Sequence, residues 1–369
     1  MADDGRWIIR ARLQFITLLL CSLLPTAGFT QQSVVLPNKA PAAAVANPNH
    51  RITLDVVVTD KSGKPVAGLQ EQDFTVLDDK RPTKILSFAA IDESDPPKTP
   101  VQGVVVMDAV NIPFQRVGYE RQQLEKFLRM NGGQLAIPMS LVFVTDAGAQ
   151  MQPASTRDGN ALAGLLNSNQ TGLRSITRSA GFYGAIERVQ MSLNAIDELA
   201  TYEAKQPGRK LVLWLSRGWP LLSGPNIELT AKDQQAIFQT IVSFSDRLRE
   251  AGIALYSIDQ QGPEDAGSLQ AFYYQEFVKG VPSANKAQNG NLGLQVLAAQ
   301  TGGQVLTSSN DIVGAIASCV QDAKAFYIIS IESPPADSPN EYHAVQVKMA
   351  KHGLTARTRT GYYAQPYKE

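Results

Sequence analysis

The chain has 369 residues, of which 44% are hydrophobic and 18% are charged. Its 34 basic and 34 acidic side chains balance, so the composition gives no reason to expect nucleic acid or an anionic membrane as a partner. The apolar content is sufficient for one large domain and a smaller one.

Residues 1–28 have the layout of a secretory signal peptide. Arginines precede an apolar run from Leu13 to Leu24, and Pro25 and small residues follow it. The run is too short to span a bilayer comfortably, so we expect cleavage rather than retention as an anchor, and no membrane span afterwards. The expected location is secreted or periplasmic. Residues 29–50 are rich in Ala, Pro and Asn and are expected to form a flexible linker.

Residues 51–95 are expected to form a small N-terminal β domain. Every second residue from Ile52 to Val58 is apolar, which predicts a strand, and "DKSGKP" predicts a turn. These strands are too few to bury a face by themselves. Residues 340–365 alternate in the same way around a turn at His352, so we predict a C-terminal β hairpin that completes the N-terminal β domain.

The segment from residue 100 to residue 332 alternates apolar strands with amphipathic helices, which predicts a parallel sheet covered on both faces. The expected strands are Gly103–Met107, Ser140–Thr145, Lys210–Leu215, Ile253–Ile258, Gln304–Leu306 and Phe326–Ile331. The expected helices are Tyr119–Met130, Arg157–Asn167, Gly181–Tyr202, Ala231–Ala251, Leu292–Thr301 and Ile312–Ala323. Right-handed crossovers would place the residues that follow the strands at one edge of the sheet. Those residues are Asp108, Asp146, Ser216 and Asp259.

Several kinds of site lack their signature in this sequence. No Gly-rich nucleotide-binding motif occurs, and no spacing of His, Cys, Asp and Glu indicates zinc. The three histidines, His50, His343 and His352, lie outside the central segment, so a Ser-His-Asp site at the sheet edge would have no base. Cys319 has apolar neighbours at helical spacing, which predicts a buried small hydrophobe.

Three segments resemble the von Willebrand factor type A domain family: "VVVMDAVN", "SITRSAGFYGAIERV" and "RKLVLWLSRGWP". The flanking "VVVTDKSGKPVAGLQEQDFTVLDD" and "RTRTGYYA" resemble the exported von Willebrand A-related proteins of acidobacteria. The resemblance implies an α/β fold with a doubly wound, mostly parallel sheet, together with a small all-β domain built from the N- and C-terminal segments. It also implies protein binding rather than catalysis.

Members of that family usually bind a divalent cation at the sheet edge through Asp-x-Ser-x-Ser, a Thr and an Asp, a set of hard oxygen ligands suited to Mg²⁺. Asp108 matches the first Asp, but Val110 and Ile112 stand where the two serines belong. Thr177 is the best match for the Thr, with Ser179 as the alternative.

Arg217 takes the place of the last Asp and would repel Mg²⁺. The resemblance therefore implies a degenerate site with no cofactor, and a Mg²⁺ ion held by Asp108 and Thr177 is the weaker alternative. Arg217 is expected to pair with Asp108 in place of the metal, either as a structural staple or as part of a binding surface.

The expected function is that of an exported, adhesion-like protein-interaction module without enzymatic activity. The proposed partner-binding residues are Asp108, Asn111, Thr177, Ser179, Arg217 and Trp219, with Asn111 holding the first loop and Trp219 as an exposed anchor. The partner would be a protein. The long segment from Gln260 to Asn291 is expected either to cover the sheet edge as a lid or to pack into its own core.

Two other functions stay open. One is a structural protein of the cell envelope with an inert sheet edge. The other is a hydrolase that uses Asp108 with Asp146 or Asp259.

Overall fold

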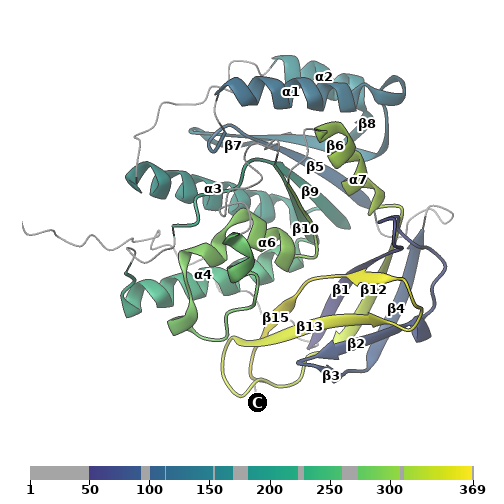
Figure 1. Ribbon diagram of the computed structural model, residues 1–369, viewed down its shortest axis with the longest axis vertical. Coiled ribbons are helices and arrows are strands. Elements are labelled where there is room, and N and C mark those ends of the chain that lie inside the picture. The colour runs from purple at the N-terminus through teal and green to yellow at the C-terminus, as the bar shows by residue number, and fades with distance from the viewer. Residues whose placement is uncertain are drawn as a thin grey trace, which may run out of the picture. The chain divides into compact units, whose positions relative to one another are not determined.

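The fold is mixed α/β, with one mostly parallel sheet and two small antiparallel sheets (Figure 1). A computed structural model describes residues 50–92, 100–112, 114–152, 154–168, 182–222, 228–259, 273–307 and 311–367. The predicted signal peptide and nearly all of the predicted linker lie outside these residues. Within them, no helix is both long and apolar enough to cross a membrane.

The central sheet has seven strands, and β5 (Val101–Asp108) lies in its middle. Its neighbours β6 (Gln134–Thr145) and β9 (Arg209–Leu215) are parallel to it, and β10 (Ile253–Ile258) and β11 (Val305–Leu306) continue the parallel sheet beyond β9. The short β7 (Gly148–Met151) and β8 (Thr156–Asp158) pair antiparallel with β6. The chain places β6 on one side of β5 and then β9, β10 and β11 on the other. The strand order therefore reverses beside β5, the position where open α/β sheets bind ligands.

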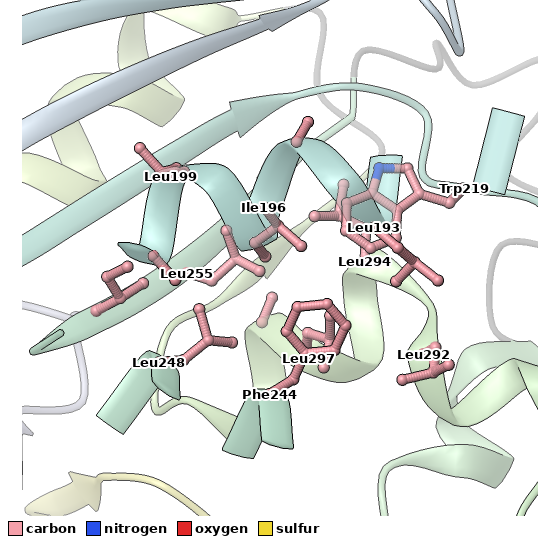
Figure 2. Close-up of a cluster of buried hydrophobic side chains, with 14 of the residues drawn as sticks. Leu193, Ile196, Leu199, Trp219, Phe244, Leu248, Leu255, Leu292, Leu294 and Leu297 are labelled. Atoms are coloured by element: carbon pink, nitrogen blue, oxygen red, sulfur yellow. The ribbon is translucent and has the colours of Figure 1, made fainter. Parts of the chain in front are cut away.

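Helices cover both faces of this sheet, because alternate residues of its apolar strands point to opposite faces. One face carries α1 (Phe114–Leu128), α2 (Gly159–Ser168) and α7 (Ile312–Gln321). The other carries α3 (Phe182–Glu203), α4 (Ala231–Glu250) and α6 (Leu294–Gln300). Figure 2 shows α3, α4 and α6 contributing Leu193, Phe244 and Leu297 to the core on this second face. Cys319 is buried in the core of the first face, as predicted.

The remaining strands form two four-stranded sheets that enclose a separate apolar core. The first sheet has the order β14 (Thr355–Arg357), β1 (Arg51–Thr59), β12 (Ala325–Glu332) and β4 (Ile85–Asp92). The second has the order β15 (Gly361–Ala364), β13 (Glu341–Met349), β2 (Phe74–Asp78) and β3 (Arg81–Pro82). Strands from both ends of the described chain thus pair with each other. We call this pair of sheets the sandwich.

Short 3-10 helices complete the described secondary structure. They are η1 (Glu71–Asp73), η2 (Met130–Gly133), η4 (Tyr274–Phe277), η5 (Ala284–Lys286) and η6 (Asn289–Leu292).

The prediction that Phe326–Ile331 belongs to the parallel sheet is wrong. Strand β12 pairs antiparallel with β1 and with β4 in the sandwich. Its Tyr327 and Ile329 face the sandwich core, while Phe326 packs into the core of the central sheet. A strand that is buried on both faces has the same continuous apolar pattern as a parallel central strand, so the pattern alone cannot distinguish the two.

The predicted C-terminal hairpin also differs from the structure. Strand β13 does not pair with the strand that follows the turn: β13 lies between β2 and β15, whereas β14 pairs with β1 in the other sheet. The turn therefore carries the chain from one sheet of the sandwich to the other. Alternation predicts each strand but not its partner.

Candidate functional site

The candidate site is the edge of the central sheet at the C-terminal ends of its parallel strands. Strand β5 ends at Asp108, whose side chain is 1% exposed. One carboxylate oxygen of Asp108 accepts hydrogen bonds from the backbone N–H groups of Val110 and Asn111, each at 3.0 Å. The other accepts from the Asn111 side-chain amide and from the indole of Trp214, each at 2.9 Å. Four donors thus satisfy this buried carboxylate, and all four are uncharged.

Asn111 connects the loop after β5 to helix α3. Its side-chain amide also donates to the hydroxyl of Ser192 at 2.8 Å, and Ser192 in turn donates to the carbonyl of Arg188 at 2.8 Å. The bond from this amide to Asp108 confirms the expectation that Asn111 forms a hydrogen bond within the first loop.

Arg217 does not pair with Asp108, contrary to our expectation. The donors described above, Trp214 and Asn111 among them, account for the hydrogen bonds of the Asp108 carboxylate within the described chain. Arg217 is half-buried in the loop after β9, where its carbonyl accepts a hydrogen bond from Gln295 at 3.2 Å. The stabilisation that was expected from a guanidinium comes instead from an indole and an amide.

Trp219 is buried and not exposed as expected. Its side chain is 3% exposed and packs edge to face against Trp214, with 5.2 Å between ring centroids. Figure 2 shows it in the apolar cluster beside Leu193 and Leu294. Trp219 therefore belongs to the apolar core that packs against strand β9. Thr177 and Ser179, the two other predicted residues, lie outside the described residues.

The residues at this edge do not fit the metal site that the family resemblance implies. Both oxygens of Asp108 already accept N–H groups, and Val110 and Ile112 offer no side-chain oxygen where serines are needed. A Mg²⁺ ion needs several oxygen ligands in nearly octahedral geometry. Of the two further carboxylates expected here, Asp146 is exposed and Asp259 is buried.

Glu120 is a member of this edge that sequence reasoning missed. This residue of α1 is 2% exposed, and one of its carboxylate oxygens is buried without a hydrogen-bond partner. Burial raises the pKa of Glu120 well above its ordinary value, and the nearby charges of Asp108 and Asp259 raise it further. The helical spacing from Val117 to Leu124 places Glu120 on the buried face of α1, a signal that could have identified it.

A second polar cluster lies in the sandwich, far from the edge in sequence. Nδ1 of His343 lies 2.9 Å from a carboxylate oxygen of Asp78 and 3.4 Å from one of Asp79, and Tyr362 donates to Asp78 at 2.7 Å. In the described chain, these His and Asp side chains are the group whose ligand atoms lie close enough together to hold a metal ion. The sequence spacing gave no sign of the cluster because the pairing of β2 with β13 brings its members together.

Part of the segment that was expected to act as a lid borders a pocket of about 600 Å³. Tyr273 and Lys279 line this pocket, and Phe277 at its wall is itself buried. Residues 260–272 of the segment lie outside the described residues. The burial of Phe277 agrees with packing into the core, and the lid over the sheet edge stays a prediction.

No protein-family model matches this chain, and no curated protein sequence matches it either. The family resemblance consequently rests on the motifs quoted from the sequence.

Proposed function

We propose that this chain is an exported protein-interaction module whose central part is a von Willebrand A-like, doubly wound α/β domain. Two observations support this proposal. The strand order reverses beside β5, and helices cover both faces of the mostly parallel sheet. The sandwich contains the first and the last strand of the described chain, β1 and β15.

The observation that carries the proposal is the reversal of strand order beside β5, because open α/β sheets bind ligands at that position. The Asp108 carboxylate at this edge is already occupied by uncharged donors. A partner would then bind through the edge loops themselves rather than through a shared cation. Half-buried Arg217 and exposed Asp146 are proposed contacts, and Thr177 and Ser179 stay proposed contacts outside the described residues. Buried Asp108 and Trp219, and Asn111 through its internal hydrogen bonds, are proposed to support this edge.

The hydrolase alternative receives some support from Glu120. A carboxylic acid whose pKa is raised by burial and by two neighbouring carboxylates is a pattern found in general acids. Glu120 is nevertheless 2% exposed, so a substrate would reach it only after α1 or the edge loops had moved. We therefore place this alternative second. A structural role in the envelope would need no accessible edge at all.

Site-specific photo-crosslinking tests the proposed surface. A photoreactive amino acid at position 217 should capture a defined protein from the host's exported fraction, and the same group at exposed position 84 in the sandwich should not. Arg217→Glu should weaken binding of the captured protein, whereas the matched charge reversal Lys84→Glu should leave it unchanged. Equal capture at both positions would contradict the proposal and favour the structural role.

A further inference from the structure

Three arginines line a second pocket at the opposite, N-terminal edge of the central sheet. The pocket has a volume of about 220 Å³ and lies where the starts of β9 and β10 and the end of α4 meet β1 and β12 of the sandwich. Arg209, Arg249 and Arg359 are in its wall together with a single carboxylate, that of Asp55. The charged groups in the wall therefore carry a positive excess.

These guanidinium groups are buried to an unusual degree for arginine. Arg209 and Arg359 are 3% and 8% exposed, and the side chain of Arg249 is 14% exposed. The Nε atoms of Arg209 and Arg249 are both buried without a hydrogen-bond partner. A buried charge with unused donors is costly unless something binds it.

The carboxylates nearby form ion pairs with two of the three arginines, Arg249 and Arg209. Asp246 and Glu250 lie 3.3 and 3.5 Å from Arg249, and Asp55 lies 3.6 Å from Nε of Arg209. Arg209 also donates to the carbonyl of Asp322 at 2.8 Å.

Arg359 has no such partner: within the described chain it forms neither an ion pair nor a side-chain hydrogen bond. Burial lowers the pKa of Arg359 to about 10 and the charge of Arg249 lowers it too, whereas the charges of Asp55 and Asp246 act in the opposite direction. Its guanidinium is nearly all charged at neutral pH and lies in the wall of an open pocket. This is the arrangement expected of a site that is completed by an anion.

The volume limits the size of that anion. At about 220 Å³ the pocket is smaller than the roughly 300 Å³ of the smallest typical ligand sites, yet it exceeds the space of several waters. Guanidinium groups bind the oxygens of phosphate through paired, charge-assisted hydrogen bonds. From these contacts we propose that the pocket binds a phosphate group, and that inorganic hydrogen phosphate is its preferred form.

Asp55 provides the reason for that preference. Hydrogen phosphate keeps a proton at neutral pH and can donate it in a hydrogen bond to the Asp55 carboxylate, while its other oxygens accept from the arginines. Sulfate has no proton to donate, and a phosphate monoester, with a second pKa of about 6, has mostly lost its own. Sulfate and a phosphate monoester would each place an unprotonated, negatively charged oxygen beside the Asp55 carboxylate, and the repulsion would weaken their binding.

Isothermal titration calorimetry on the full chain tests the proposal, with sodium phosphate, sodium sulfate and glycerol phosphate titrated at matched ionic strength. Phosphate should bind at one saturable site, and the two other anions should bind more weakly. Arg359→Gln should weaken phosphate binding by about tenfold or more, because charge-assisted hydrogen bonds are lost. Arg81→Gln, an exposed arginine on β3, is the matched control and should bind as the wild type does.

Asp55→Asn provides an independent measurement. It should reduce or remove the preference for phosphate over sulfate, because an amide can donate to an unprotonated oxygen. Absence of saturable phosphate binding to the wild type would overturn the proposal, as would unchanged binding by a folded Arg359→Gln variant. If that variant does not fold, the melting temperature of the wild type decides: a rise with phosphate that exceeds the rise with sulfate supports the site, and equal rises overturn it.

Discussion

At one edge of the central sheet, the buried carboxylate of Asp108 accepts hydrogen bonds from four N–H donors. At the other edge, the buried guanidinium of Arg359 lines a pocket and has no hydrogen-bond partner in the described chain. Both side chains are more than nine-tenths buried. The difference indicates that burial of a charge does not by itself mark a binding site. Whether the protein satisfies that charge is the more informative property.

Removing the satisfied charge should have the largest effect on stability. Asp108→Ala leaves buried N–H groups of Val110, Asn111 and Trp214 without an acceptor, so the free energy of unfolding should fall by about 3 kcal/mol or more. Urea denaturation measures this change. Asp146→Ala, at an exposed carboxylate of the same edge, should change it by less than about 0.5 kcal/mol. An equal decrease in the free energy of unfolding of the two variants would show that the hydrogen bonds to Asp108 do not stabilise the fold.

The pH dependence of stability should reveal Glu120. The folded protein raises the pKa of this group, so the folded state binds the proton more tightly than the unfolded state. Stability from this group is complete at low pH and is lost as the pH rises from the ordinary glutamate pKa of about 4.5 towards the raised value. The loss amounts to about 1.4 kcal/mol for each pH unit in that window.

The variant Glu120→Gln should remove this part of the pH dependence and be more stable than the wild type at neutral pH. Exposed Glu198→Gln is the control and should follow the wild-type profile in urea denaturation across the pH range. Parallel profiles for the wild type and Glu120→Gln would contradict the expectation.

Removing the unsatisfied charge should have the opposite sign from removing Asp108. In a buffer without phosphate, Arg359→Met should raise the free energy of unfolding by about 1–2 kcal/mol, because an apolar side chain replaces a buried charge. Arg209→Met should instead destabilise the protein, since Arg209 binds the Asp322 carbonyl and lies 4.6 Å from the ring of Phe326. Thermal or urea unfolding of both variants measures the contrast. If both substitutions lower the free energy of unfolding, the Arg359 guanidinium already has stabilising interactions within the protein.

The smallest effect should come from a divalent cation. Millimolar Mg²⁺, or its removal by a chelator, should shift the melting temperature by less than about 1 °C, because the Asp108 carboxylate already has its hydrogen bonds and too few oxygens surround it. Differential scanning fluorimetry measures the shift. A Mg²⁺-dependent rise of several degrees would restore the metal site that the family resemblance implies.

Local patterns predicted the elements well, and long-range contacts account for what they missed. Helical spacing located α4 and α7 within two residues, and the strand-end position of Asp108 located the edge. The exposure of Trp219 was predicted wrongly because a neighbouring proline suggested a loop, whereas the packing of its ring on Trp214 could not be deduced.

The arginine pocket was beyond prediction for the same reason. Arg209 and Arg359 are separated by much of the chain, and they meet only because the sandwich packs beside the starts of β9 and β10. No local spacing pattern in the sequence predicts that these two arginines lie in one pocket. The partner of β12 was equally hidden, since its apolar pattern is compatible with either sheet.

The pairing of β1 with β12 and β14 has a kinetic consequence. Residues of β1 pair with residues near Glu332 and Arg357, so the first strand of the described chain pairs only after most of the described chain has been synthesised. Contacts at such long sequence separation slow folding and leave an apolar strand exposed meanwhile. Under the proposed export, this delay would leave β1 unpaired while the chain is translocated.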